Sequence, residues 1–258
     1  MRSFGRFVET LGGRYITAMD SGTRVADMDA IATETRWVSC TSDAGDPSPY
    51  TARGVFEGIC AAVRHRLGRD QLSGVRVALQ GLGHVGFAVA RHLHDAGARL
   101  IVCDLDPQRV TAAIQAFGAR TVAPEEIYAA PADVFCPCGL GAVLNDVSIA
   151  QLQCAIVAGS ANNQLAEPRH GEQLRNRGIL YAPDYLINAG GLIFVALHHA
   201  RAPARAIDNK VRGIGDQLKA LFEQADRERR PTSEVADSRA ESIIASAAAD
   251  AGAHHSAA

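Results

Sequence analysis

Residues 75–104, VRVALQGLGHVGFAVARHLHDAGARLIVCD, decide the fold. A mostly apolar run is followed by the glycine turn GLGHVG, then by a stretch with helical spacing, and then by a second apolar run that ends at Asp104. This order predicts strand, turn, helix and strand. It is the start of a parallel sheet with helices on both faces.

The glycine turn predicts a dinucleotide site. Gly81, Gly83 and Gly86 have the spacing that permits a tight turn, a close approach of the backbone to a pyrophosphate, and close packing of the following helix. Asp104 stands where an acidic residue would accept hydrogen bonds from the ribose hydroxyls of the adenosine and repel a 2′-phosphate. The sequence therefore favours NAD over NADP, although the nearby Arg109 leaves NADP open.

Further strands and helices alternate along the chain. The predicted strands lie at 14–18, 75–80, 99–104, near 121, and at 132–137, 155–160 and 178–184. The predicted helices cover 25–34, 51–68, 87–97, 107–117, 185–200 and much of 203–248. Such alternation predicts an α/β fold with a doubly wound parallel sheet. The predicted strand at 14–18 is isolated, and a lone strand needs neighbours for its backbone hydrogen bonds.

The composition narrows the class of protein. The chain has 258 residues, 47% of them hydrophobic, and a formal charge of −2, which exclude a disordered or fibrous protein and give no broad basic surface for nucleic acid. We find neither a signal peptide nor an apolar stretch long enough to span a membrane. The six cysteines are scattered, which favours a reducing compartment and the cytoplasm. A small-molecule partner fits best.

Lysine is rare in this sequence. Of 26 basic residues only Lys210 and Lys219 are lysines, so the first 209 residues contain none. A genome that favours arginine codons explains the composition. The chemical consequence is that no amine in those 209 residues could transfer a proton as a buried lysine does.

Several blocks together carry a family resemblance. They are GRYITAMDSGT (13–23), GDPSPYTARGV (45–55), residues 78–104, PCGLGAVLND (137–146), VAGSANNQL (157–165) and YAPDYLINAGGLI (181–193). In this order they resemble the glutamate/leucine/phenylalanine/valine dehydrogenases, most closely those for leucine, phenylalanine and valine, over roughly residues 4–240. The resemblance implies a Rossmann-type domain and NAD-dependent oxidative deamination of an apolar L-amino acid to a 2-oxo acid and ammonia.

The resemblance also implies roles for single residues. Asp20 matches the acid that exchanges protons with the substrate nitrogen, although a turn or cap acid is the plainer interpretation. Thr51 matches a hydroxyl that meets the nicotinamide carboxamide, or it caps its helix. Asn162 and Asn163 match the pair that orients nicotinamide and substrate, or they form an Asx turn. Asn188 lines the cleft in relatives, or it caps a helix break.

The predicted cofactor site and substrate pocket follow. The cofactor residues are Thr51, Gly81, Gly83, His84, Val85, Gly86, Asp104, Cys138, Asn162, Asn163 and Asn188. The positions that shape the substrate pocket are Ala18, Leu192 and Val195, all of them apolar, which fits an aliphatic or aromatic side chain better than glutamate. Cys136 and Cys138 could suggest a metal, but without a second matched pair they are expected to pack beside the cofactor.

The relatives also carry two lysines upstream of the block that begins near Phe4. One grips the substrate carboxylate, and the other, in a GGGK segment, activates water. We therefore expect residues 1–68 to be the remnant of a substrate and dimerisation domain, 69–200 to be the NAD-binding domain, 201–248 to be helices that pack back on the first domain, and 249–258 to be a disordered tail.

Three explanations stay open for the lysine-free start. The chain is a fragment or a mis-started reading, a short paralogue that binds NAD without efficient catalysis, or a subunit whose partner supplies the segment. In relatives the upstream residues cover apolar faces of residues 14–18, of the helix from Thr51 and of the C-terminal helices. Left uncovered, these faces predict a homo-oligomer.

Overall fold

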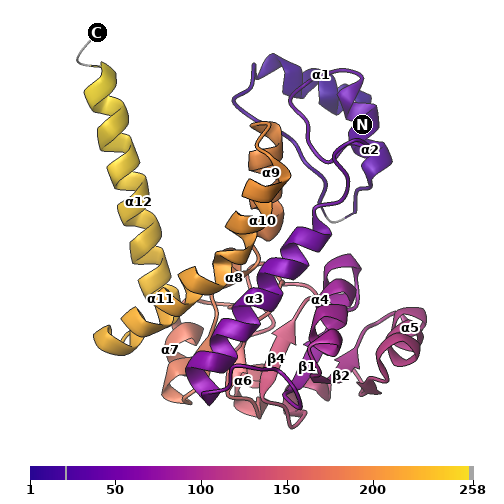
Figure 1. The fold of residues 1–258 in the computed structure, drawn as a ribbon, viewed down its shortest axis with the longest axis vertical. Helices are drawn as coiled ribbons and strands as arrows, with labels where there is room; N and C mark the ends of the chain where they lie inside the picture. Colours follow the sequence, from indigo (N-terminus) through magenta and orange to yellow (C-terminus); the bar gives the residue numbers. More distant parts are fainter. Residues whose placement is uncertain (21, 256–258) are drawn as a thin grey trace.

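The computed structural model describes residues 1–20 and 22–255, with 248–255 as backbone only. Its centre is a six-stranded, all-parallel sheet in the order β3-β2-β1-β4-β5-β6 (Figure 1). The strands are β1 (Arg76–Gln80), β2 (Arg99–Cys103), β3 (Arg120–Thr121), β4 (Val134–Pro137), β5 (Ile156–Val157) and β6 (Leu180–Tyr181). The predicted doubly wound parallel sheet is confirmed.

Helices surround the sheet and extend beyond it. They are α1 (Arg2–Thr10), α2 (Val25–Ala32), α3 (Ser48–Leu67), α4 (His84–Asp95), α5 (Pro107–Phe117), η1 (Ile127–Ala129), α6 (Asp146–Gln151), α7 (Arg169–Asn176), α8 (Asp184–Ile187), α9 (Gly190–His199), α10 (Ala204–Arg212), α11 (Ile214–Glu228) and α12 (Thr232–His255). Helix α12 is assigned where the sequence predicts a disordered tail from 249, and residues 256–258 of that tail lie outside the described residues. Among the described residues, no helix combines the length and apolar character that a membrane span needs.

Local sequence signals explain where the helices begin and end. Asp106 caps α5 by accepting from the backbone N–H of Gln108 at 2.9 Å, and Pro107 occupies the first turn, where its missing N–H costs nothing. Gly118 ends α5 and Gly68 ends α3, both in the left-handed conformation that favours glycine. Helix α5 therefore has the predicted bounds.

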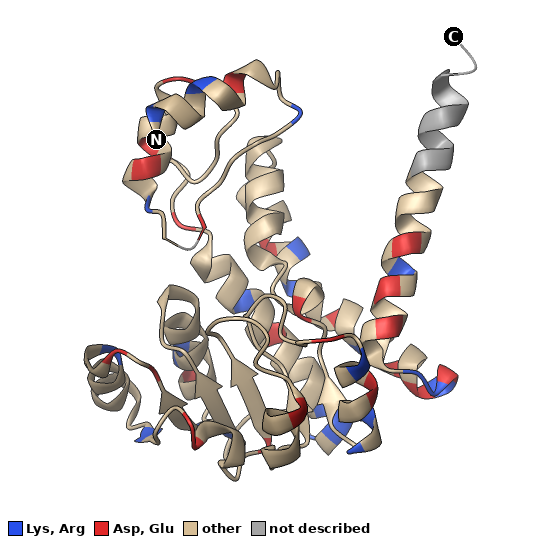
Figure 2. Cartoon of the chain, turned by 180° about the vertical axis from the view of Figure 1, so that it is seen from behind, with Lys and Arg blue, Asp and Glu red and all other residues tan. Residues whose placement is uncertain are grey.

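The two faces of the sheet carry separate apolar layers, because successive residues of a strand point to opposite sides. Val77 and Leu79 of β1 are fully buried in the layer that α3 and α4 cover. Ala78 of β1 and Phe135 of β4 are buried on the other face, where η1, α6 and α7 supply the cover. Figure 2 shows the sheet mostly uncharged, with both signs of charge interspersed on the outer helices.

The predicted strand at 14–18 is wrong. This segment forms only an isolated parallel bridge between Thr17 and Val38. The described residues provide no adjacent strand to extend that bridge into a ladder, and a single bridge does not define a strand.

Helix α3 joins the two ends of the molecule. It packs on α4 beside the sheet and on α9, α10 and α11 of the C-terminal half, where the fully buried Phe222 lies 5.3 Å from the ring of His65. Residues 1–20 and 22–47 lie beyond its first turn, beside α9 (Figure 1), where the rings of Trp37 and His199 are 6.1 Å apart. Helix α12 packs instead on α11, α7 and β6. One apolar cluster thus runs across the boundary predicted at 68.

An ion pair joins the starts of β1 and β4. The Asp133 carboxylate accepts from the Arg76 backbone N–H and from its Nη2, each at 2.8 Å. These hydrogen bonds from Arg76 hold the pKa of Asp133 below its ordinary value. The stability that these bonds contribute is therefore fully present above about pH 3.9, the pKa of an aspartate in the unfolded chain. It is lost as the pH falls through the lower pKa of Asp133 in the folded protein.

Asp133→Asn is expected to lower the free energy of unfolding at pH 7 by about 1 kcal/mol, a modest value because half of Arg76 is exposed to solvent. Urea unfolding of both proteins between pH 7 and pH 3 measures it, and the difference should shrink below about pH 4. Asp70→Asn is the matched control, since its pair with Arg64 is mostly exposed. An equal loss in both variants, or a difference independent of pH, would contradict this account.

Candidate functional site

The sheet has a switch point between β1 and β4. The chain leaves β1 toward β2 on one side, whereas β4 and β5 extend the sheet on the other side. The chain therefore leaves β1 and β4 toward opposite sides at the carboxyl edge, and ligands of open α/β sheets bind in the crevice at such a switch point.

The glycine turn after β1 packs against the loop after β4. Gly81 has a φ of +93°, and a Cβ there would lie 2.8 Å from the Gly139 nitrogen. A Cβ on Gly86 would lie 2.0 Å from the Gly81 oxygen. Side chains are excluded at both positions, because backbone atoms already occupy the space.

Helix α4 begins at this turn with its first N–H groups open. Gly83 is the residue before the helix and has no side chain with which to cap it. A Cβ on Gly83 would meet nothing within 4 Å, so the space in front of the helix is free. His84 is exposed and Val85 is half-buried. Free donors and the positive end of the helix dipole suit an anionic group.

Asp104 lies beside this turn at the end of β2. Its Oδ2 accepts from the Leu82 N–H at 2.5 Å and its Oδ1 accepts from the Asp106 N–H at 2.8 Å. Only 8% of its side chain is exposed, and Arg109 Nη1 lies 3.8 Å from Oδ2. The two backbone donors fix the direction of the carboxylate next to the glycine turn.

The loop after β5 is tied to the start of α9. Asn188 Nδ2 donates to Asn162 Oδ1 at 2.6 Å and to the Ser160 oxygen at 3.2 Å. Asn163 has a φ of +51°, and its carbonyl accepts from the Ala142 N–H at 2.7 Å. Asn162 and Asn188 thus share one side-chain network, and the Asn163 backbone ties the same loop to the loop after β4.

Two cysteines stand where β4 ends. The Sγ atoms of Cys136 and Cys138 are 3.6 Å apart, and the Cys138 N–H donates to the Gln80 oxygen at 2.7 Å. Hydrogen bonds from Cys136 and Ser160 hold the pKa of the Cys138 thiol below its ordinary value, whereas the bond to Cys138 and burial raise the pKa of Cys136. Within the described residues no third metal-ligating side chain joins them.

Thr51 lies in the first turn of α3. A Cβ on Gly191 would lie 2.5 Å from Thr51 Oγ1, and one on Gly190 would lie 2.0 Å from the Tyr50 oxygen. The start of α9 therefore rests directly on the start of α3. This contact places the Thr51 hydroxyl beside the two glycines that follow Asn188.

The predicted substrate residues lie on two elements. Asp20 is exposed in the segment between α1 and α2, and its N–H donates to Thr23 Oγ1 at 3.0 Å. Ala18 of the same segment is half-buried. Leu192 and Val195 are one turn apart on α9, and Leu192 is 72% exposed. A large apolar side chain exposed to this degree on a short helix is available for contact with a ligand.

Sequence reasoning missed Gln164 and Asp184. Gln164 is fully buried, and its Nε2 donates to the oxygens of Gly159 and Ala161 at 2.9 Å each. Its N–H donates to Asp184 Oδ2 at 2.8 Å. Both residues stand in blocks that carry the resemblance, but only the fold shows that they position the loop containing Asn162.

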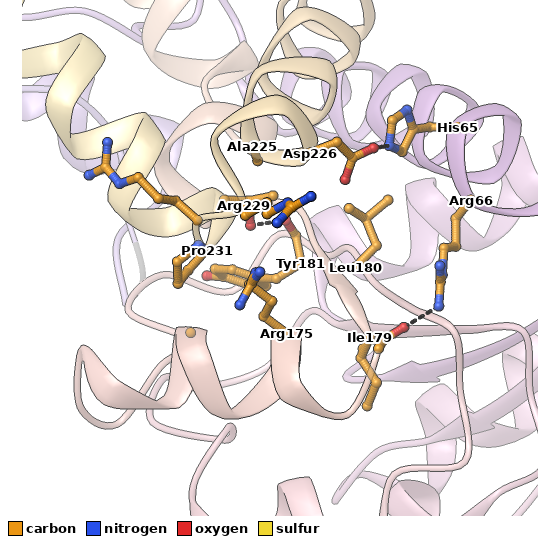
Figure 3. A pocket seen from close by; sticks show the side chains of 14 residues that line it. His65, Arg66, Arg175, Ile179, Leu180, Tyr181, Ala225, Asp226, Arg229 and Pro231 are labelled. Carbon is orange, nitrogen blue, oxygen red and sulfur yellow. Dashed lines mark hydrogen bonds and ion pairs between the residues drawn. The ribbon is translucent and has the colours of Figure 1, made fainter.

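A separate cavity of about 250 Å³ lies at the far end of α3 (Figure 3). Its lining includes Arg66, Arg175, Tyr181 and Arg229, and an ion pair of 3.0 Å between His65 Nε2 and Asp226 Oδ2 closes one side. None of the predicted site residues lines it.

The strand order and the crevice define a Rossmann-type α/β protein. A family model described as Glutamate/Leucine/Phenylalanine/Valine dehydrogenase matches residues 104–249. A leucine dehydrogenase from Thermoactinomyces intermedius is 49% identical over 247 residues, which are 94% of this chain and 68% of that protein. The chain belongs to the glutamate/leucine/phenylalanine/valine dehydrogenase family, as its sequence blocks predict.

Solved structures of similar fold belong to the same kind of enzyme. The crystal structure of L-tryptophan dehydrogenase from Nostoc punctiforme has a TM-score of 0.83 and 42% identity, and the match covers 95% of this chain and 71% of that chain. A hetero-hexameric glutamate dehydrogenase from Thermus thermophilus, in a Leu-bound form, has a TM-score of 0.72 and 25% identity over 91% of this chain and 64% of that chain. The family of amino-acid dehydrogenases is therefore shared in both sequence and fold.

Asn188→Ala is expected to loosen the loop after β5, because the Asn162 side chain and the Ser160 carbonyl lose their shared donor. The free energy of unfolding should fall by about 1–2 kcal/mol, and amide hydrogen exchange should accelerate across residues 160–164. Asn209→Ala, at an exposed position of α10, is the control and should change neither. Unchanged exchange at 160–164 would show that the network does not hold the loop.

Proposed function

We propose that this chain catalyses the NAD-dependent oxidative deamination of an apolar L-amino acid to its 2-oxo acid and ammonia. The observation that carries the proposal is the crevice at the switch point, where the uncapped start of α4 faces open space beside the fixed carboxylate of Asp104. Membership of an amino-acid dehydrogenase family supplies the reaction class.

The residues present fit a dinucleotide. The open N–H groups at the start of α4 would hold the pyrophosphate, and Asp104 would accept hydrogen bonds from the adenosine ribose hydroxyls. When bound, NAD accepts a hydride from the substrate α-carbon. Thr51 and the network of Asn162 and Asn188 would orient the nicotinamide end, since Asn162 stands in the loop after β5 at the carboxyl edge and Thr51 packs on Gly191 near Asn188.

Charge favours NAD over NADP. A buried carboxylate at Asp104 repels a 2′-phosphate placed on the same ribose. Arg109 could attract such a phosphate, but it lies 3.8 Å from Asp104 and 3.5 Å from Asp106, so carboxylates already neutralise its charge.

The substrate pocket selects an apolar side chain. Ala18, Leu192 and Val195 offer no charge or hydrogen bond to a glutamate carboxylate, whose burial without a partner is costly. Asp20 would exchange protons with the substrate nitrogen, a role for which a carboxylate in a solvent-accessible turn is suited. The names of the relatives, leucine and L-tryptophan dehydrogenase, agree with an apolar substrate.

A second candidate is an NAD-binding module that does not turn over substrate by itself. It is favoured by the position of the two lysines of this sequence, since Lys210 and Lys219 lie exposed on α10 and α11. Neither lysine therefore stands in the buried setting in which a lysine amine acts as a base.

NADH formation by the purified chain at alkaline pH tests the first candidate. Leucine, valine and phenylalanine should each support turnover, and glutamate should not. Gly86→Ala should abolish activity, because its Cβ would collide with the Gly81 backbone. Gly118→Ala is the matched control: it strains a left-handed glycine at the C-terminal end of α5, away from the glycine turn, and should retain activity. Tight NADH binding without turnover would replace the first candidate with the second.

We also infer that the chain assembles into homo-oligomers. Phe7 of α1 and Ile243 and Ile244 of α12 are between 60% and 69% exposed, and large apolar side chains at the surface favour association. Light scattering coupled to size-exclusion chromatography should give a mass of at least two chains. A single monodisperse monomer at micromolar concentration would contradict this inference.

A further inference from the structure

Cys136 and Cys138 form a close thiol pair beneath the glycine turn. Their Sγ atoms are 3.6 Å apart, because residues two apart at the end of a strand project from the same face. A disulfide bond is about 2.05 Å long and tolerates Cα separations up to about 6.8 Å, close to the span of two strand residues. The sulfurs therefore need to approach by only about 1.5 Å.

We propose that this pair is an oxidisable site at which a hydroperoxide forms a Cys136–Cys138 disulfide, and that the disulfide blocks dinucleotide binding at the adjacent turn. The second half of this proposal rests on the proposed function.

The two thiols differ in access, which assigns their roles. Cys138 is partly exposed, whereas Cys136 is fully buried. With hydrogen peroxide as the hydroperoxide, the Cys138 thiolate attacks one oxygen, the O–O bond breaks, and the released hydroxide takes a proton to become water. Cys138 is then a sulfenic acid. The Cys136 sulfur attacks it, the S–O bond breaks, and the leaving hydroxide combines with the Cys136 proton as a second water. The two sulfurs lose two electrons, which reduce one peroxide.

The other cysteines are protected from this reaction. Burial raises the pKa of Cys60, Cys103 and Cys154 to about 11, and Cys40 is fully buried. Only the thiolate reacts with peroxide. At pH 8 a thiol with a pKa of 11 is about one part in a thousand thiolate. Cys138, whose pKa lies below its ordinary value, has both the charge and the access.

The pair is coupled to the turn through the backbone. A Cβ on Gly81 would lie 2.9 Å from the Cys138 carbonyl carbon, and one on Gly86 would lie 3.1 Å from Cys138 Cβ. The turn and Cys138 are therefore in close contact, with no space between them. Drawing Cys138 toward Cys136 therefore displaces the atoms against which the turn packs, and a dinucleotide bound at the turn should in turn slow the oxidation.

The test treats the reduced full-length chain with hydrogen peroxide, alkylates the remaining thiols and maps the products by mass spectrometry. The peptide containing both residues should lose two hydrogen atoms and resist alkylation, so that free thiols fall by two from the six of the sequence. NADH affinity, followed by its fluorescence, should fall more than about tenfold and recover with dithiothreitol. NADH added first should slow the loss of thiols.

Variants distinguish oxidation of the Cys136–Cys138 pair from oxidation elsewhere in the chain. Cys136→Ser, which keeps a hydroxyl donor beside Cys138, should bind NADH when reduced and stop at a Cys138 sulfenic acid, which dimedone traps. Cys136→Ala should do the same more slowly, because it removes the hydrogen bond that favours the Cys138 thiolate. Cys154→Ala, the matched control, should still form the disulfide. Oxidation first at another cysteine, or a disulfide that leaves NADH affinity unchanged, would overturn the proposal. If the reduced chain fails to bind NADH, the proposed function fails, and the mass map still decides whether the pair oxidises.

Discussion

The turn after β1 and the loop after β4 meet backbone to backbone, and the rest of the site depends on that contact. A Cβ on Gly81 would fall 2.8 Å from the Gly139 nitrogen in the loop after β4, and one on Gly86 would fall 2.0 Å from the Gly81 oxygen within the turn itself, so neither position has room for a side chain. This closeness brings the start of α4 to the switch point, where Gly83 has no side chain with which to cap the helix. The Asp104 carboxylate lies beside the same turn, because the Leu82 N–H donates to it.

A second close contact sets the other wall of the crevice. Gly190 and Gly191 let α9 begin directly on the first turn of α3, so that Thr51 meets the segment that carries Asn188. Helix α3 then runs along α4 and the sheet, with α11 packed on its outer side. The position of Leu192 relative to the glycine turn thus depends on one long helix, whose packing is apolar throughout its middle.

The sequence predicts much of the fold because its signals are local. The turn glycines, the Asp106 cap and the glycines that end α3 and α5 each act within a few residues, and the helix at 107–117 is found with its bounds. The strand predicted at 14–18 is wrong because its partner depends on the rest of the fold, and β5 and β6 are shorter than their apolar runs for the same reason.

The site residues also fall into those that local spacing predicts and those that only the fold reveals. Gly81, Gly86 and Asp104 follow from spacing, because phosphate and ribose recognition requires them in that order. The roles of Asp20 and Thr51 rest on resemblance alone. Gln164 and Asp184 escaped notice because their importance lies in long-range hydrogen bonds that no spacing in the sequence reveals.

The central claim is that the crevice beside Asp104 holds NAD and discriminates against NADP. Isothermal titration calorimetry of the purified chain with each cofactor measures this directly. The account predicts one NAD site per chain, bound at least about tenfold more tightly than NADP, since one buried charge acting on the 2′-phosphate contributes more than about 1.4 kcal/mol. Equal affinities, or tighter binding of NADP, would contradict it.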